Sequence, residues 1–173
     1  NLRKKVEPDD YSSTTRLNTL QAGVTLSAIG SGVSDDSVSS LDAPQASTGS
    51  RVFGPFSSAC GGYCSDWTTE SRQLRIDFAT AVSTLSIDAI GSSTAGIGRL
   101  EVYGADNQLL ARATSQQLTA GQIETLSIQR QRADIKYAIV RSHNNTVVRL
   151  DNFFFDATAT TETDAYGTFT FAN

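Results

Sequence analysis

The residues of this chain whose chemistry is most clearly predicted are two cysteines. Cys60 and Cys64 are separated by Gly-Gly-Tyr, within the segment FSSACGGYCSDW. Cysteines at this spacing reach the Cα separation of a disulfide when the intervening turn folds back, and glycine permits such a turn. A metal site would need more thiolate or imidazole ligands, and the chain offers a single histidine, His143. We therefore expect a disulfide rather than free thiols, which would place the protein in an oxidising compartment.

Three further side chains of the same segment have the chemistry of a sugar-binding surface. Tyr63 and Trp67, the single tryptophan, carry flat apolar rings that can stack on the C–H faces of a sugar. Asp66 offers a carboxylate to neighbouring hydroxyl groups. The alternative is structural: Trp67 fills one end of a hydrophobic core and Tyr63 is simply exposed. Residue type and spacing leave both interpretations open.

A second polar loop, RSHNNT at 141–146, lies between two apolar segments. The guanidinium, imidazole and amide groups of Arg141, His143 and Asn144 present donors and acceptors that suit vicinal hydroxyls or carboxylates. The Asn-Asn pair is also favoured in turns for backbone reasons alone. A solvated turn is therefore the alternative to a binding loop.

Acidic residues near both ends of the chain suit a hard cation. EPDD at 7–10 and LDNF at 150–153 supply carboxylates, and calcium takes roughly six to eight oxygen ligands from such groups. Leu150, Phe153 and Phe155 share one face of a strand only when Asp151-Asn152 forms a bulge, which would re-aim the Asp151 side chain. In the alternative, the first segment starts an ordinary turn and Asp151 pairs with Arg149.

Catalytic machinery is weakly represented. Nucleophilic serine or cysteine catalysis needs an oriented histidine, and His143 lies in an Asn-rich loop without a nucleophile elbow. No pair among the 18 acidic residues is marked by its context as the carboxylate pair of a glycosidase. We expect a binding protein rather than an enzyme.

The elements that must position these residues are expected to be strands. QLRIDFA at 73–79 alternates apolar and polar residues, as a half-buried antiparallel strand does. Short strands recurring about every 12 residues, with Gly, Ser and Asn turns between them, predict an all-β fold, an antiparallel β-sandwich of jelly-roll type. The expected strands are 23–29, 51–53, 73–79, 82–90, 100–103, 109–113, 122–129, 135–141 and 147–156.

The remaining segments complete a single expected domain over 1–173, with its core at about 7–156. Residues 34–41 are expected to form one or two helical turns, since Ser and Asp cap helices well. The Thr-rich stretch 157–163 is typical of a linker, and the alternation at 166–171 predicts an extra strand.

Composition excludes several other classes of protein. The chain has 173 residues, with 14 basic against 18 acidic residues and a net charge of −4, so it lacks the basic patch that duplex nucleic acid requires. No apolar run approaches the ~18 residues of a membrane span. The opening NLRKKVEPDD is polar, so any export signal is expected to have been removed or to lie outside this sequence.

Five segments, in this order, resemble the galactose-binding-like jelly-roll modules of exported bacterial proteins, including some with PEP-CTERM sorting tails. They are ASTGSRVFG (46–54), LRIDFATAVSTLSIDAI (74–90), RLEVYGADNQLL (99–110), GQIETLSI (121–128) and LDNFFFD (150–156). The resemblance implies a β-sandwich that binds glycans and is often appended to a carbohydrate-active enzyme. It also implies a structural calcium, whose ligands by position are Glu7, Asp10 and Asp151.

These features together predict a non-catalytic carbohydrate-binding module, secreted or on the cell surface and part of a larger multidomain protein. The residues of both polar loops would contact a polysaccharide or oligosaccharide, and calcium would hold the N-terminal segment against the last core strand. The alternative is a structural or adhesive β-sandwich module that has no small-molecule ligand.

Overall fold

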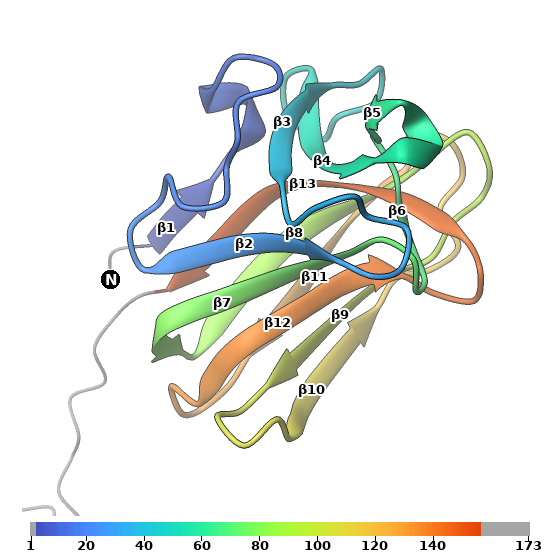
Figure 1. The fold of residues 1–173 in the computed structure, drawn as a ribbon. Coiled ribbons are helices and arrows are strands. Elements are labelled where there is room, and N and C mark those ends of the chain that lie inside the picture. Colours follow the sequence, from blue (N-terminus) through green and yellow to red (C-terminus); the bar gives the residue numbers. More distant parts are fainter. Residues whose placement is uncertain (1–2, 157–173) are drawn as a thin grey trace, which may run out of the picture.

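The computed structural model describes residues 3–156, which form antiparallel sheets (Figure 1). The first sheet, β1-β13-β8-β11 with β6 paired to β13, contains β1 (Arg3–Val6), β6 (Trp67–Thr68), β8 (Thr84–Gly91), β11 (Ile123–Gln129) and β13 (Val147–Asp156). The second, β10-β9-β12-β7-β2, contains β2 (Val24–Ile29), β7 (Gln73–Val82), β9 (Gly98–Tyr103), β10 (Leu109–Thr114) and β12 (Ile135–Ser142). The third contains β3 (Val38–Asp42), β4 (Arg51–Ser57) and β5 (Gly62–Tyr63).

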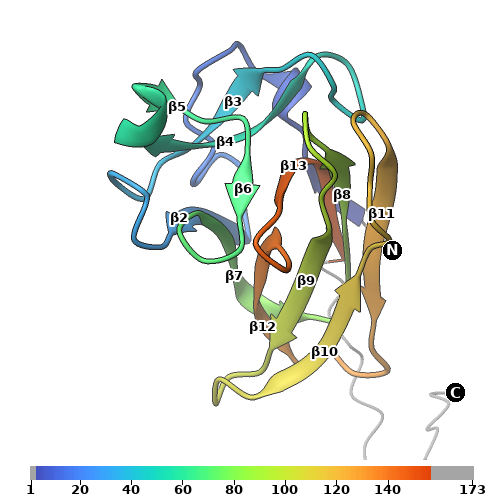
Figure 2. The same cartoon turned by 90° about the vertical axis from the view of Figure 1, so that its right-hand side faces the viewer.

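The two five-stranded sheets lie as separate layers, with the three-stranded sheet at one end (Figures 1 and 2). The core fills the space between the layers, because each sheet turns its apolar positions inward. On β7, Leu74, Ile76 and Phe78 are buried while the residues between them face outward. The expected all-β, jelly-roll-like sandwich is confirmed, and the strands predicted from alternation are found.

One predicted element is wrong. Residues 34–41 do not form helical turns: the chain makes a bend in which the Asp35 carboxylate accepts a hydrogen bond from the Ser37 backbone N–H, and then enters β3. Ser39 and Ser40 are fully buried in that strand, which pairs with β4. Ser and Asp side chains bond their own backbone in turns as readily as at helix caps, so the local pattern did not distinguish the two.

The bulge predicted at Asp151-Asn152 is confirmed. The pairing of β13 with β8 shifts register between Asp151 and Phe154, and Asn152 adopts a left-handed conformation with φ of 53°. The bulge lets the side chains of Leu150 and Phe153 both point into the core, while the Asp151 side chain points in a different direction.

The strands β1, β5 and β6 were not predicted, because each is too short to show alternation and is formed by pairing with a distant segment. The linker and strand predicted at 157–163 and 166–171 lie outside the described residues. Within residues 3–156, no helix is long and apolar enough to cross a membrane.

Candidate functional site

The predicted disulfide is confirmed. Cys60 and Cys64 are bonded to each other, with their Cα atoms 5.5 Å apart. The chain reaches this arrangement through the short 3₁₀ helix η2 (Ser58–Cys60) and a left-handed Gly61, whose φ is 66°. Residues with a β-carbon rarely adopt this conformation, which explains glycine at this position.

Reducing this disulfide is expected to lower the free energy of unfolding by no more than about 2 kcal/mol, because the loop that it closes is short. Urea unfolding with and without reductant measures the difference. The unreduced protein should also be lighter than the reduced one by two hydrogen atoms. A loss much larger than this would show that the bridge holds more of the fold than its own loop.

The three side chains predicted to form a sugar-binding surface beside the disulfide do not share a surface. Trp67 lies on β6 with no exposed surface, and its indole Nε1 donates a hydrogen bond to the Phe53 carbonyl at 2.9 Å. Tyr63 packs edge-on against Phe56, and the Asp66 carboxylate accepts a hydrogen bond from Ser92. Trp67 therefore belongs to the core, which is the structural alternative that its sequence context left open.

The polar loop 141–146 connects β12 in the second sheet to β13 in the first. Asn144 and Asn145 both have positive φ, 62° and 56°, a left-handed conformation that asparagine tolerates better than most residues in turns. The backbone therefore accounts for Asn144. Arg141 and His143 have other neighbours: alternation along β12 turns Arg141 to the outer face of the second sheet, and His143, just after β12, contacts Arg99 of β9.

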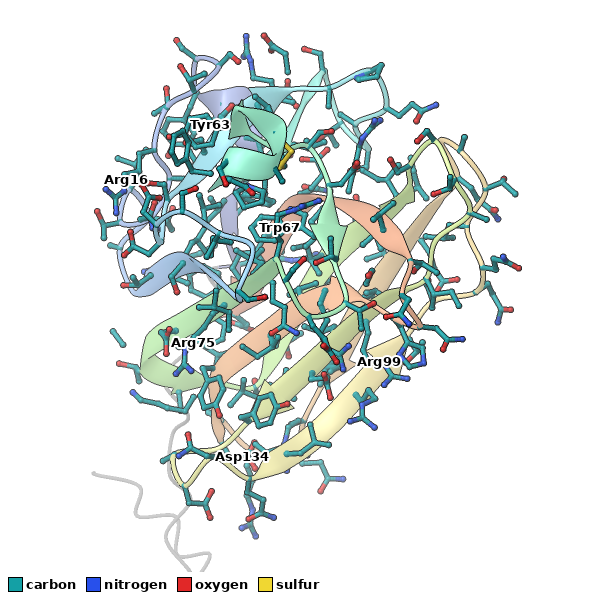
Figure 3. The ribbon with its side chains drawn as sticks, turned by 45° about the vertical axis from the view of Figure 1, so that its right-hand side comes forward. Arg16, Tyr63, Trp67, Arg75, Arg99 and Asp134 are labelled. Atoms are coloured by element: carbon teal, nitrogen blue, oxygen red, sulfur yellow. A yellow bond between two sulfur atoms is a disulfide. The ribbon has the colours of Figure 1, made fainter. Side chains whose placement is uncertain are left out.

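That outer face brings together charged and aromatic side chains from β7, β9 and β12, which we call the arginine–tyrosine face: Arg75, Glu101, Tyr103, Tyr137 and Arg141. Cross-strand pairing sets Tyr137 opposite Tyr103, and Ile139 opposite both Arg75 and Glu101. In Figure 3 the sheet turns this face toward the viewer, with Arg75 and Arg99 on different strands of it.

Planar groups are stacked across three strands of the arginine–tyrosine face. The rings of Tyr103 and Tyr137 lie 4.8 Å apart and nearly parallel, and the Arg75 guanidinium lies 4.1 Å from the centre of the Tyr137 ring. Arg75 is held there by hydrogen bonds to Asp77. Both faces of Tyr137 are thus occupied, whereas Tyr103 turns its second face toward β10 and the exposed Leu109.

Glu101 anchors the polar side of this face. Its carboxylate accepts from Arg141 and Arg112, at 2.9 and 2.6 Å, and its side chain is only 6% exposed. Burial opposes its ionisation, but the hydrogen bonds and charges of the two arginines outweigh burial and lower the pKa of Glu101. A hollow of about 330 Å³ opens here, lined by Thr69, Glu70, Gln73, Glu101, Tyr103, Ile139 and Arg141.

None of these residues except Arg141 was predicted as a site residue. Alternation in the sequence does turn Arg75, Tyr103 and Tyr137 away from the core. Alternation indicates which face of its strand each residue occupies. That these residues are neighbours depends on the order of the strands in the sheet.

A cluster of acidic side chains joins the N-terminal segment to β13. Carboxylate oxygens of Glu7, Asp9 and Asp151 lie within 4.8 Å of one another, and none of the three forms an ion pair with a basic residue among residues 3–156. Asp10, which was predicted as a ligand, is not a member of this cluster, and its carboxylate pairs with Lys5 at 3.1 Å. The 3₁₀ helix η1 (Pro8–Asp10) turns Asp9 toward the cluster instead.

Asp151 is the buried member of this acidic cluster. It is fully buried and accepts hydrogen bonds from the backbone N–H groups of Ser47 and Thr48, while the Thr48 hydroxyl donates to Glu7. Burial, together with the neighbouring charge of Glu7, raises the pKa of Asp151 to about 7. Clustered carboxylate and hydroxyl oxygens with an unneutralised buried charge fit a hard divalent cation. The alternative pairing with Arg149 is wrong, since Arg149 contacts Gln45 and Asp66.

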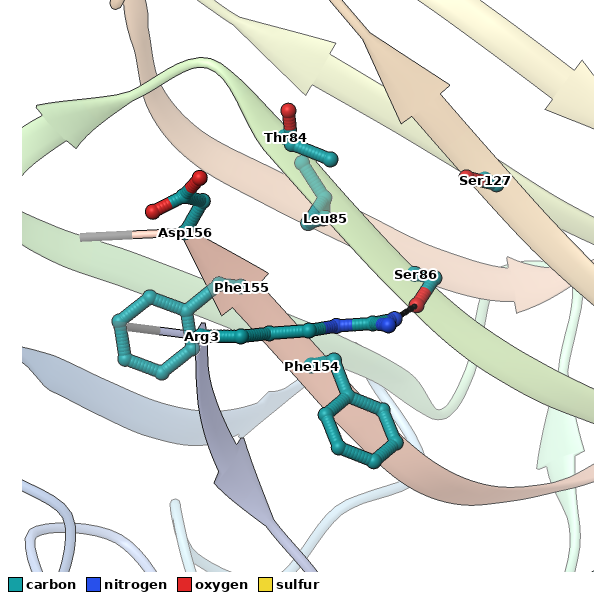
Figure 4. A pocket seen from close by; sticks show the side chains of 8 residues that line it. All are labelled: Arg3, Thr84, Leu85, Ser86, Ser127, Phe154, Phe155 and Asp156. Atoms are coloured by element: carbon teal, nitrogen blue, oxygen red, sulfur yellow. Dashed lines mark hydrogen bonds between the residues drawn. The ribbon is translucent and has the colours of Figure 1, made fainter. Parts of the chain in front are cut away.

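A second hollow, of about 360 Å³, lies on the outer face of the other sheet (Figure 4). The Arg3 guanidinium crosses it, 4.3 Å from the centre of the Phe154 ring, and donates a hydrogen bond to Ser86. These contacts fasten the edge strand β1 to β13 and β8, and they make the Arg3 side chain part of the lining of the hollow.

No known protein family matches the sequence, and no curated protein is similar to it at a significant level. Among solved structures, the K2 cleaved adhesin domain of Lys-gingipain is similar over 90% of this chain and 99% of that one, with 10% identity and a TM-score of 0.46. A family 6 carbohydrate-binding module from Clostridium stercorarium, CsCBM6-3 in complex with cellobiose, is similar over 90% and 94%, with 14% identity and a TM-score of 0.42.

Proposed function

We propose that this protein is a non-catalytic carbohydrate-binding module and that it binds a glycan chain on the arginine–tyrosine face. The observation that carries the proposal is the arrangement at Glu101, where a nearly buried carboxylate fixes Arg141 at a hollow that the half-buried Tyr103 also lines. Sugar recognition needs such a combination, because a sugar ring presents an apolar C–H face and a rim of hydroxyl groups together.

The polar groups of this face are held in fixed positions before any ligand arrives. Arg141 is 17% exposed and donates to Glu101, to the Ser142 carbonyl and to the Thr69 carbonyl. A side chain restrained in this way loses little conformational entropy when it binds a ligand. The hollow beside it gives a hydroxyl-bearing ring access to Glu101, Arg141 and Gln73. Tyr63, Trp67 and Asp66 lie outside this proposed contact surface.

We also propose that calcium occupies the cluster of Glu7, Asp9 and Asp151. The ion would neutralise the carboxylates of Asp151 and Glu7, which have no basic partner among residues 3–156, and would join the N-terminal segment to β13. Its place, away from the arginine–tyrosine face, makes the role of this calcium structural.

The disulfide supports a secreted or cell-surface location, since such bonds persist in oxidising compartments. We place the whole chain, 1–173, in a single domain of a larger multidomain protein. In that setting the module would bring a neighbouring domain to a polysaccharide.

Replacing Tyr103 by alanine is expected to weaken polysaccharide binding about tenfold, because the ring supplies the apolar surface of the site. The polysaccharide is whichever one retards the unaltered protein in a gel. Native electrophoresis through gels that contain neutral or acidic polysaccharides measures the retardation. Tyr63→Ala is the matched control, since it removes a tyrosine ring from β5 and should leave retardation unchanged.

The alternative function, a structural or adhesive module without a small-molecule ligand, makes the opposite prediction. If the unaltered protein passes through every gel without retardation, the carbohydrate-binding function is rejected. Retardation that Tyr103→Ala leaves intact would move the site to another surface of the protein.

A further inference from the structure

One end of the arginine–tyrosine face carries more positive charge than the protein neutralises. Arg141 on β12 lies directly opposite Arg99 on β9, and Arg112 on β10 lies opposite Glu101. Three guanidinium groups thus gather around a single carboxylate, a surplus of two positive charges in a chain whose net charge is −4. Like charges directly opposite each other on a sheet are destabilising.

Arg99 is the unneutralised member of this group. Glu101 forms ion pairs with Arg112 and Arg141, whereas Arg99 donates to the Thr114 hydroxyl, at 3.1 Å, and contacts the His143 Nε2, at 3.0 Å. Among residues 3–156, no carboxylate lies within ion-pair distance of Arg99. The nearby Glu70 lines the adjoining hollow and pairs with none of the three arginines in the described part of the chain.

His143 does not supply the missing negative charge, and its contact with Arg99 fixes its state. A guanidinium has no acceptor, so Arg99 donates and Nε2 must accept with its lone pair, which only the unprotonated nitrogen has. Burial and the charge of Arg99 both lower the pKa of His143, in agreement with a neutral ring. The imidazole therefore orients Arg99 without neutralising it.

We propose that Arg99, with Arg141 beside it, binds the anionic group of an acidic sugar, so that the glycan recognised by this module carries carboxylate or sulfate groups. The inference rests on the proposed function, because it assigns a ligand class to the same face. Guanidinium groups present paired N–H donors in a plane, which match the oxygens of a carboxylate or a sulfate ester. The Tyr103 ring lies four residues from Arg99 along β9, on the same face, and would contact the glycan chain.

The test compares acidic and neutral ligands that share a backbone. The probes are polygalacturonate with its methyl ester, for a carboxylate, and dextran sulfate with dextran, for a sulfate. Arg99→Gln removes the unneutralised charge and keeps a hydrogen-bonding side chain. Arg16→Gln is the matched control, because Arg16 lies far from this face (Figure 3), is ion-paired with Asp36, and its loss changes the net charge equally. Melting temperatures verify that both variants are folded.

We expect tighter binding to one acidic probe than to its neutral partner, and an affinity for that probe at least about tenfold weaker in Arg99→Gln. Arg16→Gln should bind like the unaltered protein, and which acidic probe responds identifies the source of the anionic group. Equal losses in both variants would show general charge attraction and overturn the inference. Equal binding of acidic and neutral partners would overturn it while the carbohydrate-binding function stands, and retention of no polysaccharide at all would reject both.

Discussion

Trp67→Ala is expected to destabilise the protein by about 3–5 kcal/mol, a large part of the total stability of an ordinary domain. The indole has no exposed surface, so its removal leaves a cavity at the junction of β6, β13 and β4. It also leaves the Phe53 carbonyl without the donor at 2.9 Å, and an unsatisfied buried acceptor adds its own cost. Urea unfolding followed by circular dichroism measures the change.

Two other variants help to separate the cost of the cavity from the cost of the lost hydrogen bond. Trp67→Phe keeps most of the ring volume and loses the N–H, so it should cost clearly less than Trp67→Ala. Tyr63→Ala removes a partly exposed ring with one edge contact and should cost less than about 2 kcal/mol. If Trp67→Ala were instead as stable as the unaltered protein but no longer retained polysaccharide, the indole would be a ligand contact and its place in the core would be wrong.

Removing calcium is expected to lower the melting temperature by roughly 5–10 °C when the protein starts with calcium at about 100 times its dissociation constant. Binding to the folded state alone stabilises that state, and the three carboxylates come together only on folding. Thermal unfolding with added calcium and with added chelator measures the shift. An unchanged melting temperature would eliminate the calcium site.

The increase in melting temperature caused by calcium should depend on pH in a defined direction. Without the ion, folding raises the pKa of Asp151 to about 7, so the protonated carboxyl favours the folded state and this contribution is lost as pH rises from about 4 through 7. Calcium needs the ionised carboxylate. The stabilisation by calcium should therefore be larger at pH 8 than at pH 5.

Asp151→Asn provides the internal check on this pH effect. The amide keeps the size of the side chain and does not ionise, so calcium should no longer raise the melting temperature of this variant. Glu70→Gln is the matched control, because it removes one exposed carboxylate outside the cluster. A calcium response that survives in Asp151→Asn and disappears in Glu70→Gln would place the ion elsewhere.

In the acidic cluster, the sequence predicts the bulge at Asp151 but not which neighbouring aspartate joins it. LDNFFF predicted the bulge at Asp151, because no regular strand places Leu150, Phe153 and Phe155 on one face. The choice between Asp9 and Asp10 could not be made in the same way. Those neighbours differ only in the direction that η1 gives each of them, toward the loop at 47–51 or toward Lys5.

The sequence by itself determined the longer strands, which alternate, the face of each that is buried and the closure of the Cys60–Cys64 loop, because these depend on alternation and on short spacings. The tertiary structure alone decided that Trp67 fills the core and that Arg99, Glu101 and Tyr103 lie beside Arg141. The physical reason is that hydrogen bonding between strands distant in sequence sets which residues are neighbours across a sheet. A pattern with a period of two along one strand carries no information about that order.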